Sequence, residues 1–300
     1  MFKGSMVALI TPFKDGRLDE TALKKLVEFH VKNKTSGLVP CGTTGESATL
    51  SLAEHERVIE LVVETAAKRI PVIAGTGSNN TQEAIHLTRR AQASGADAAL
   101  LIAPYYNRPM QKGLYLHFRE IAQSVDLPLI LYNIASRTAV NIEPETIAQL
   151  AYECKNIVGV KEASGNLDQM SRVRLLAPKN FVLISGDDSL TLPVLSIGGT
   201  GVISVVANIV PQDVAKMVEE FEKGNLDKAQ QWHYRLLPLV KAMFLETNPI
   251  CVKTAMELLG MCAPGLRLPL SPMDEKNLKK LRKALSGYGL LRNQRKKKKR

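Results

Sequence analysis

Short apolar runs alternate along this chain with longer segments in which apolar residues recur every three or four positions. Several runs, including 98–103 and 127–131, are apolar at nearly every position, as is typical of parallel strands buried on both faces. Successive runs start roughly 20 to 34 residues apart, which is the length of one strand plus one helix. The pattern therefore predicts eight consecutive βα units, whose strands begin near Met6, Gly37, Pro71, Ala98, Pro128, Ile157, Phe181 and Gly201.

The intervening segments carry helix signals. Asn80, followed three residues later by Glu83, is typical of a capping box at the start of a helix. Eight alternating units favour a closed (β/α)8 TIM barrel, an α/β fold. An open doubly wound sheet stays as the alternative, because periodicity does not report whether a sheet closes. The segment 20–32 is a good example of a helix, since one face collects Leu23, Leu26, Val27 and Val31.

The region after the eighth unit differs in pattern. It predicts three helices, at 225–246, 248–261 and 274–286, interrupted by the proline-rich stretch 264–272. No Gly- or Ser-rich linker precedes these helices, so we expect them to pack on the barrel. The predicted organisation is a barrel at 1–224, a C-terminal helical region at 225–291 and a basic tail at 292–300.

Charge and composition narrow the class of protein. The 300 residues are 45% hydrophobic and 23% charged, as in ordinary globular proteins, and no apolar run approaches the roughly 18 residues of a membrane helix. The net charge is +11, but the tail 292–300 contributes seven positive charges and no negative one. Such a run is expected to be disordered and merely solvated. Weak binding to nucleic acid or another anionic surface through the tail is the alternative.

The four cysteines and five histidines show no metal-ligand spacing. Cys41, Cys154, Cys251 and Cys262 contain no C-x-x-C pair, and no second histidine follows His55 four residues on. The N-terminal apolar stretch 6–10 is too short for a signal-peptide core. We therefore expect a reduced, cytoplasmic protein that needs no metal.

Active sites of barrels lie at the carboxyl ends of the strands, and Lys161 ends the sixth predicted strand. Alternation puts Lys161 on the face of Gly159, opposite Val158 and Val160. If the two valines pack against helices, Lys161 points into the barrel. A buried lysine without a partner becomes a neutral nucleophile that can form a Schiff base with a carbonyl. A lysine that reaches solvent or pairs with Glu162 or Asp187 is the alternative, and this strand does not decide between them.

Other strand ends add polar groups to the same rim. Tyr132 can relay a proton, although a buried aromatic at a strand end is the commoner role. Thr43 and Thr44 lie between glycines in a tight turn that suits a carboxylate or a phosphate. Arg137 can grip a carboxylate with two hydrogen bonds or simply cap nearby carbonyl groups.

Five segments taken together resemble the dihydrodipicolinate synthase family of pyruvate-dependent class I aldolases and lyases. They are Gly42-Thr43-Thr44-Gly45-Glu46-Ser47, Pro104-Tyr105-Tyr106-Asn107, Tyr132-Asn133 with Ser136-Arg137-Thr138, Gly159-Val160-Lys161-Glu162 and Ser185-Gly186-Asp187-Asp188. The resemblance extends to about residue 291. It implies a TIM barrel that condenses pyruvate with L-aspartate 4-semialdehyde to 4-hydroxy-tetrahydrodipicolinate, in diaminopimelate and lysine biosynthesis.

The resemblance also implies a role for each matching residue. Lys161 forms the Schiff base, Tyr132, Thr44 and Tyr106 form a proton relay, and Arg137 binds the semialdehyde carboxylate. Thr43 and the backbone at Gly186 and Ile203 hold the bound pyruvate. The residue matching Tyr106 comes from a neighbouring subunit in the family, within a homotetramer built as a dimer of dimers. A sugar-acid aldolase of the same family is the alternative, although those enzymes generally lack the arginine.

Two further features follow from the resemblance. Many members are inhibited by lysine in a cleft between subunits, and the matching positions here are Ser47, Ala48, His55, Asn79, Glu83 and Tyr105. The family usually has proline where Ala135 stands and glycine where Ala139 stands. We expect Ala135 to loosen the backbone that aims Arg137, and Ala139 to lose a positive-φ conformation.

Overall fold

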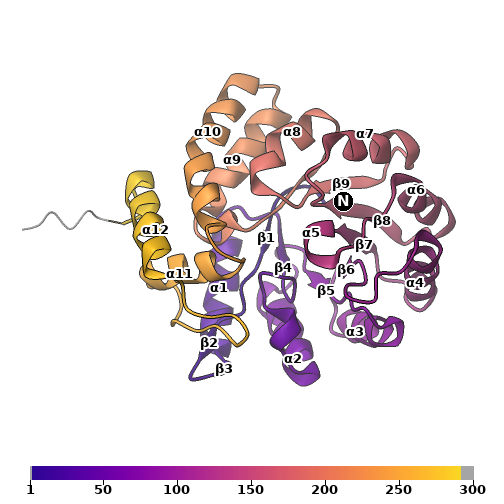
Figure 1. Ribbon diagram of the computed structural model, residues 1–300, viewed down its shortest axis with the longest axis horizontal. Coiled ribbons are helices and arrows are strands. Elements are labelled where there is room, and N and C mark those ends of the chain that lie inside the picture. Colours follow the sequence, from indigo (N-terminus) through magenta and orange to yellow (C-terminus); the bar gives the residue numbers. More distant parts are fainter. Residues whose placement is uncertain (1, 292–300) are drawn as a thin grey trace, which may run out of the picture.

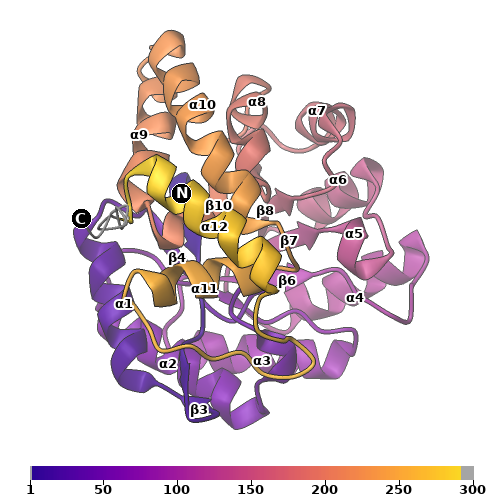
Figure 2. The same cartoon turned by 60° about the vertical axis from the view of Figure 1, so that its left-hand side comes forward.

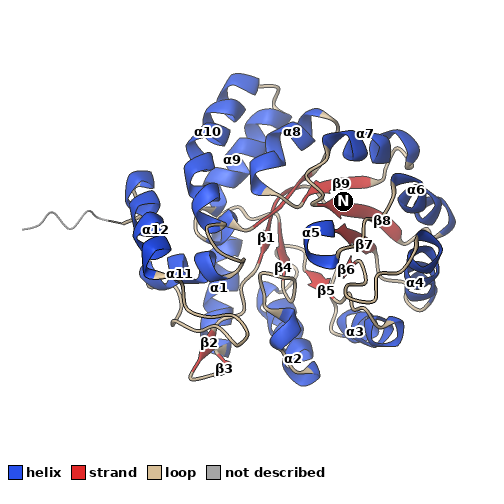
Figure 3. Ribbon diagram, in the orientation of Figure 1, coloured by secondary structure: helices blue, strands red, loops and turns tan. Residues whose placement is uncertain are grey.

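The computed structural model describes residues 2–291, and the predicted disordered tail at 292–300 lies outside the described residues. Parallel strands form an inner ring that helices surround (Figures 1 and 3). Their order around the ring is β4-β1-β10-β9-β8-β7-β6-β5. The strands are β1 (Gly4–Ala8), β4 (Gly37–Val39), β5 (Ile73–Gly75), β6 (Ala98–Ile102), β7 (Leu129–Asn133), β8 (Ile157–Glu162), β9 (Val182–Ser185) and β10 (Gly201–Ser204).

The ring closes between β4 and β5. The Leu38 amide donates to the Pro71 carbonyl at 2.9 Å, and the Gly75 amide donates to the Pro40 carbonyl at 2.9 Å. A parallel bridge joins Leu38 to Val72. The predicted (β/α)8 barrel is therefore confirmed, and the open sheet is excluded.

Each barrel strand is followed by an outer helix, as predicted. The segment 20–32 forms α1 with the predicted bounds, and its apolar face packs on the barrel. A short helix, α5 (Ala135–Thr138), is inserted after β7. The outer helices are α1 (Glu20–Lys32), α2 (Leu52–Ala66), α3 (Thr81–Ala93), α4 (Gln111–Gln123), α6 (Pro144–Glu153), α7 (Leu167–Leu176), α8 (Thr191–Ser196) and α9 (Pro211–Glu222); 3-10 turns lie at η1 (Ser47–Thr49), η2 (Asp188–Leu190) and η3 (Val206–Asn208).

Alternation along the strands separates two cores. Leu129 and Leu131 of β7 face the helices, whereas Ile130 and Tyr132 face the barrel interior. The same division holds on β6, where Ala98 and Leu100 point inward and Ala99 and Leu101 outward. The period of two thus decides which side chains can reach the centre of the barrel.

The predicted orientation of Val158 is wrong. The register between β7 and β8 shifts, so that Leu129 pairs with Ile157 and Ile130 with Gly159, which leaves Val158 as the extra residue of a bulge. Val158 therefore packs against the interior cluster, while Val160 faces the helices. Alternation resumes after the bulge, so the inward direction predicted for Lys161 is unaffected.

The predicted capping box at α3 is half right. The Asn80 side chain accepts from the amides of Gln82 and Glu83, but the Glu83 carboxylate accepts from the Ser78 hydroxyl rather than from the Asn80 amide. Ser78 takes that place, because its hydroxyl accepts from the Asn80 amide. A complete capping box lies at α2, between Ser51 and Glu54.

A small hairpin was not anticipated. β2 (Phe13–Lys14) and β3 (Arg17–Leu18) pair across a two-residue turn, Asp15-Gly16, in which both residues have positive φ. An Asp-Gly pair between short extended segments is the usual sequence of such a turn. The signal was present, but each strand is only two residues long.

The C-terminal helices α10 (Leu226–Met243), α11 (Ile250–Leu258) and α12 (Glu275–Tyr288) lie side by side along one flank of the barrel (Figure 2). They share one apolar cluster with α1, α2 and α9. No helix in residues 2–291 is long and apolar enough to cross a membrane. The segment between α10 and α11 runs over the carboxyl ends of the strands, where it reaches the site described next.

Candidate active site

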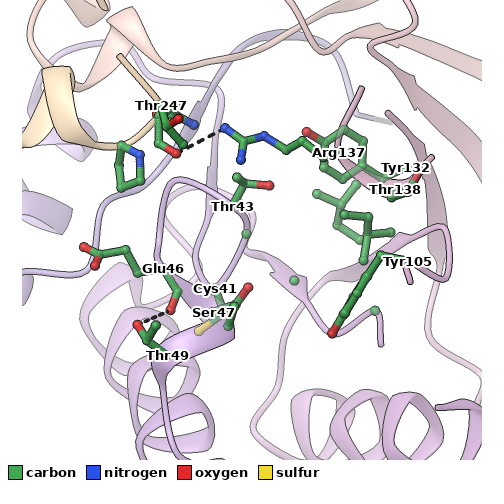
Figure 4. Close-up of a pocket in the computed structure, with 18 of the residues that line it drawn as sticks. Cys41, Thr43, Glu46, Ser47, Thr49, Tyr105, Tyr132, Arg137, Thr138 and Thr247 are labelled. Carbon is green, nitrogen blue, oxygen red and sulfur yellow. Dashed lines mark hydrogen bonds between the residues drawn. The ribbon is translucent and has the colours of Figure 1, made fainter. Parts of the chain in front are cut away.

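A pocket of about 290 Å³ opens at the carboxyl ends of the strands, where it was expected. Its walls come from the turn after β4, the ends of β5 and β6 with the segments that follow them, the β7–α5 connection, the segment that leads into α11, and residues 269–270 (Figure 4). Six residues predicted for catalysis, substrate or lysine binding line it: Thr43, Ser47, Ala48, Tyr105, Tyr132 and Arg137.

Lys161 does not line this pocket itself but lies against Tyr132, which does. Its side chain is 6% exposed, and its Nζ lies 4.0 Å from the centroid of the Tyr132 ring. Gly186 leaves room for it, since a Cβ on Gly186 would stand 3.2 Å from the Lys161 Cε. Lys161 therefore points into the barrel beside Tyr132, which is one of the two orientations that the strand pattern left open.

Both carboxylates that could have paired with Lys161 are engaged elsewhere. Glu162 is fully buried on the other face of β8, where it accepts from Asn133, Gln169 and the Ser164 amide. Asp187 accepts from the amide and hydroxyl of Ser189. Within residues 2–291 no carboxylate forms a salt bridge with Lys161, which excludes the ion-paired alternative there.

Strain and close packing shape the turn after β4. Cys41 and Glu46 have φ values of 55° and 53°, in the left-handed region that costs a non-glycine residue about 1–2 kcal/mol. A Cβ on Gly75 would stand 2.3 Å from the Cys41 carbonyl oxygen, so β5 can approach the turn only with glycine. Backbone strain of this kind is typical of functional sites. Burial raises the pKa of the Cys41 thiol, which makes it a poor nucleophile.

The two threonines of this turn differ in their surroundings. Thr43 faces the pocket, whereas Thr44 is 3% exposed and its Oγ1 accepts from the Asn248 Nδ2 at 3.0 Å. In the described chain the Thr44 hydroxyl is thus bonded to Asn248 rather than to Tyr132. Asn248 has no role in the sequence-based interpretation.

Arg137 spans the mouth of the pocket. It extends from α5 toward the Thr247–Asn248 segment, and its Nη2 donates to the Asn248 carbonyl at 3.2 Å (Figure 4). The Arg137 side chain therefore caps a carbonyl group and also lines the pocket. The other guanidinium nitrogens remain available for a carboxylate.

The expected loss of the positive-φ conformation after Arg137 is wrong. Ala139 is the C-cap of α5 and has φ 56° and ψ 20°, inside the left-handed region. The α5 backbone hydrogen bond from the Ala139 amide to the Ala135 carbonyl, at 2.9 Å, holds it there. The positive φ is thus adopted here by a strained alanine.

A buried ion pair supports the turn from behind. Lys253 of α11 donates to the Glu46 carboxylate, and the two side chains are 3% and 0% exposed. Lys253 also donates to the Thr11 carbonyl at 2.9 Å, while Glu46 accepts from the Arg267 amide. Burial lowers the pKa of Lys253, and Glu46 opposes that shift.

Sequence reasoning missed Lys253 and gave Glu46 no role. A usable signal existed, since Lys253 is the only charged residue in the apolar run 249–256. Nearby, Arg267 binds Glu54 through two nitrogens and holds the pKa of that carboxyl at about 2. Both pairs attach the C-terminal region to the turn after β4 and to α2.

Of the backbone positions predicted to hold pyruvate, Gly186 is close to Lys161, whereas neither Gly186 nor Ile203 lines the pocket. The Gly186 amide donates to the Glu162 carbonyl at 2.8 Å, and Ile203 belongs to the interior cluster that contains Tyr132. Asp188 joins the two strand ends, since its buried carboxylate accepts from the Ser204 hydroxyl and the Val205 amide. Desolvation raises the pKa of Asp188.

Tyr106 is not brought into this pocket. Its side chain is 92% exposed and its φ is 72°. In one chain it therefore stands apart from Tyr132 and Thr44.

The candidate lysine-binding residues fall into two groups. Ser47, Ala48 and Tyr105 line the pocket itself. Asn79 donates to the Tyr105 carbonyl at 3.1 Å, while Glu83 is bonded to Ser78. His55 is buried in α2, where desolvation lowers its pKa. In residues 2–291 no group of three or more His, Cys, Asp or Glu side chains is placed to hold a metal ion.

Comparison with known proteins gives a family. The dihydrodipicolinate synthetase family model matches residues 1–287. The 4-hydroxy-tetrahydrodipicolinate synthase of Endomicrobium trichonymphae is 59% identical over 97% of this chain and all of its own length. The dihydrodipicolinate synthase structure from Aquifex aeolicus matches with a TM-score of 0.96 and 52% identity over 97% of this chain and 100% of that one.

A third similar protein was solved with a ligand. It is the dihydrodipicolinate synthase of Cyanidioschyzon merolae with lysine bound, which is 42% identical, has a TM-score of 0.95, and covers 97% of this chain and 99% of that one. The resemblance seen in the sequence is thereby confirmed along the barrel and the C-terminal helices alike. The chain belongs to the dihydrodipicolinate synthetase family.

Proposed function

We propose that this chain condenses pyruvate with L-aspartate 4-semialdehyde to give 4-hydroxy-tetrahydrodipicolinate, for diaminopimelate and lysine biosynthesis in the cytoplasm. One observation carries the proposal: Lys161 is buried against Tyr132, which lines the same pocket as Arg137, and within residues 2–291 no carboxylate forms a salt bridge with it. The names of the similar proteins favour this synthase over a sugar-acid aldolase and over a binding protein that acts through the basic tail.

In the proposed reaction the Lys161 Nζ attacks the keto carbon of pyruvate, and water leaves as the imine forms. Loss of a proton from the methyl carbon gives an enamine, which forms a carbon–carbon bond to the aldehyde carbon of the second substrate. The amine of that substrate then displaces Lys161, which closes the ring and frees the enzyme. This sequence needs neither a metal nor an organic cofactor.

The remaining residues have supporting roles in the proposal. Thr43 and the backbone at Gly186 and Ile203 hold the pyruvate carboxylate and the enamine, while Tyr132 and Thr44 move protons. Tyr106 completes the relay from a neighbouring subunit of a homotetramer, which accords with its 92% exposure in a single chain. A partner's pocket gives that exposed, strained side chain a function.

Arg137 decides the second substrate. A guanidinium pairs well with the carboxylate of the semialdehyde, whereas a sugar acid presents hydroxyl groups at that position. We expect Arg137→Ala to lower kcat/KM for the semialdehyde by about 10²-fold without affecting imine formation. Steady-state rates at fixed pyruvate measure the first effect, and a loss of imine in this variant would contradict the assignment.

Lysine feedback belongs to the same proposal. Ser47, Ala48 and Tyr105 belong to the candidate lysine-binding set and also line the pocket, and Asn79 donates to the Tyr105 carbonyl. We therefore expect lysine bound to this set to contact residues that form the wall of the active site. Initial rates that stay unchanged in millimolar lysine would overturn this part.

Borohydride reduction in the presence of pyruvate tests the proposal most directly. The reduced adduct is expected on Lys161 and is identified by mass mapping of peptides. Addition of aspartate semialdehyde before the reductant should diminish the adduct by turnover. No adduct, or an adduct on another lysine, would overturn the proposed function.

A further inference from the structure

Asn248 connects the two halves of the site. It lies in the segment between α10 and α11 and is 7% exposed, with the barrel turn on one side and α5 on the other. Its side-chain Nδ2 donates to the Thr44 Oγ1 at 3.0 Å, and its backbone carbonyl accepts from the Arg137 Nη2 at 3.2 Å. One residue thus contacts a member of the proton relay and the substrate-binding arginine.

The direction of the bond to Thr44 has a chemical consequence. A hydroxyl group donates one hydrogen bond and accepts up to two. Because Asn248 donates to it, the Thr44 hydroxyl must direct its own proton elsewhere, and it is free to donate within the relay. An acceptor in place of the Asn248 Nδ2 would capture that proton.

The oxygen of the same side-chain amide lowers the stability of the folded chain. Asn248 Oδ1 is buried and accepts no hydrogen bond from residues 2–291. An unpartnered buried acceptor opposes folding, so each such group calls for an explanation. An amide retained for its donor explains why this position is polar.

The segment that carries Asn248 is firmly held. The Lys253 amide donates to the Pro249 carbonyl at 3.0 Å, and the Lys253 side chain forms the buried pair with Glu46. Glu46 and Thr44 belong to one turn, so the donor and the hydroxyl are fixed to each other from both sides. A rigid support of this kind is what orients a catalytic hydroxyl.

We propose that Asn248 is a positioning residue, which fixes the direction of the Thr44 hydroxyl for proton transfer while its carbonyl anchors Arg137. The inference rests on the proposed function, since it assigns Thr44 to the relay. It predicts that removal of the side-chain donor slows proton transfer and leaves imine formation and pyruvate binding intact.

Two variants separate the donor from the space it fills. Asn248→Ala removes the side chain beyond Cβ, and kcat should fall about tenfold. Asn248→Asp keeps the shape but replaces the donor by an acceptor, and kcat should fall about 10²-fold. Both keep the backbone carbonyl that Arg137 contacts, so KM for the semialdehyde should change less than about threefold.

Asn277→Ala is the matched control. The Asn277 amide joins α12 to Glu246 at 2.9 Å in the same C-terminal region, and Asn277 does not line the pocket. It loses one hydrogen bond between elements, as Asn248→Ala does. Its kcat should equal that of the wild type.

Three readouts decide the outcome. They are kcat and both KM values, borohydride trapping of pyruvate, and exchange of the pyruvate methyl protons in D2O followed by NMR. The exchange passes through the enamine and needs only the first substrate. Support requires that exchange and kcat fall in both variants, with the greater loss in Asn248→Asp, while trapping stays at the wild-type level.

Opposite results overturn the inference. These are kcat and exchange within twofold of wild type in both variants, a greater loss in Asn248→Ala than in Asn248→Asp, or an equal loss in Asn277→Ala. If the wild-type protein forms the imine but does not turn over the semialdehyde, only the proposed second substrate is rejected. Exchange of the methyl protons then still tests the role of Asn248. Absence of an imine on Lys161 in the wild type rejects both proposals.

Discussion

Two lysines are buried among the described residues, and their surroundings are opposite. Lys253 is 3% exposed and lies against the Glu46 carboxylate, with the Thr11 carbonyl as a further acceptor. Lys161 is 6% exposed, yet its neighbours are the Tyr132 ring and Gly186 rather than a carboxylate. Burial is therefore common to both lysines, and the partner is what distinguishes the proposed nucleophile from the structural lysine.

The two lysines also stand on different parts of the molecule. Lys161 ends a barrel strand, and Lys253 lies on α11 in the added C-terminal region. In the proposed function the barrel supplies the groups that react, and the C-terminal region supplies charges and amides that hold those groups in place. This division predicts that replacement of Lys161 affects chemistry first and that replacement of Lys253 affects stability first.

Replacement of Lys161 should have the largest effect. Lys161→Ala removes the buried amine beside Tyr132, so we expect kcat to fall at least about 10⁴-fold and trapping of pyruvate to disappear. Stability should not fall with it, because no ion pair is broken. Lys155→Ala, an exposed lysine just before β8, is the control for trapping and rates. Residual imine in Lys161→Ala would place the nucleophile elsewhere.

Replacement of Lys253 should have the largest effect on stability. Lys253→Met leaves the Glu46 carboxylate buried without a cation, with the Arg267 amide as its remaining donor, which costs about 3–5 kcal/mol of unfolding free energy. The double variant Lys253→Met/Glu46→Gln removes both charges and should recover much of that loss. Urea unfolding measures all of these values.

An exposed salt bridge between a lysine and an aspartate provides the comparison for Lys253. Lys68 bonds to Asp97 at 2.8 Å with its side chain 65% exposed, so Lys68→Met should cost less than about 1 kcal/mol. Equal losses in Lys68→Met and Lys253→Met would mean that burial of the Glu46 pair contributes nothing.

The sequence predicted the reacting side of this comparison far better than the supporting side. The period of two in a strand set Lys161 opposite Val160, which does face the helices, and the strand ends of a barrel meet on one rim. Lys253 and Asn248 reach the site through contacts across more than 200 residues, which no local pattern encodes. The sequence did not predict the bulge at Val158 for a related reason: a bulge is defined by the pairing of two strands and not by the pattern within one strand.

A buried base outside the site tests the effect of burial without a partner. His30 of α1 contacts Thr35 through Nδ1, its Nε2 has no partner within residues 2–291, and burial lowers its pKa to about 3. In the unfolded chain the imidazole binds a proton below about pH 6.5, whereas in the folded chain burial keeps it neutral until about pH 3. The contribution of His30 to stability is therefore complete above about pH 6.5 and is lost as the pH decreases toward 3. At pH 5 the loss should be about 2 kcal/mol.

His30→Gln should reduce the stability difference between pH 8 and pH 5 by about that 2 kcal/mol, in urea unfolding at both pH values. His86→Gln is the control, because His86 lies exposed beside Glu56. An unchanged difference in His30→Gln would mean that His30 is not held neutral by burial. Lys161 would then lose its parallel as a base buried without a charged partner.

The smallest effect is expected at Ala139, where the barrel carries a strained residue next to Arg137. Ala139→Gly relieves the left-handed alanine at φ 56° but increases the entropy of the unfolded chain, so the net gain should be about 0.5–1 kcal/mol. Ala67→Gly, at the exposed C-cap of α2 with φ 47°, is the matched control and should gain as much. Since Ala139 already adopts the conformation that glycine allows, KM for the semialdehyde should not change. A clear fall in KM with Ala139→Gly, absent in Ala67→Gly, would show that the alanine misplaces Arg137, and the loop would then join the parts of the barrel that limit the reaction.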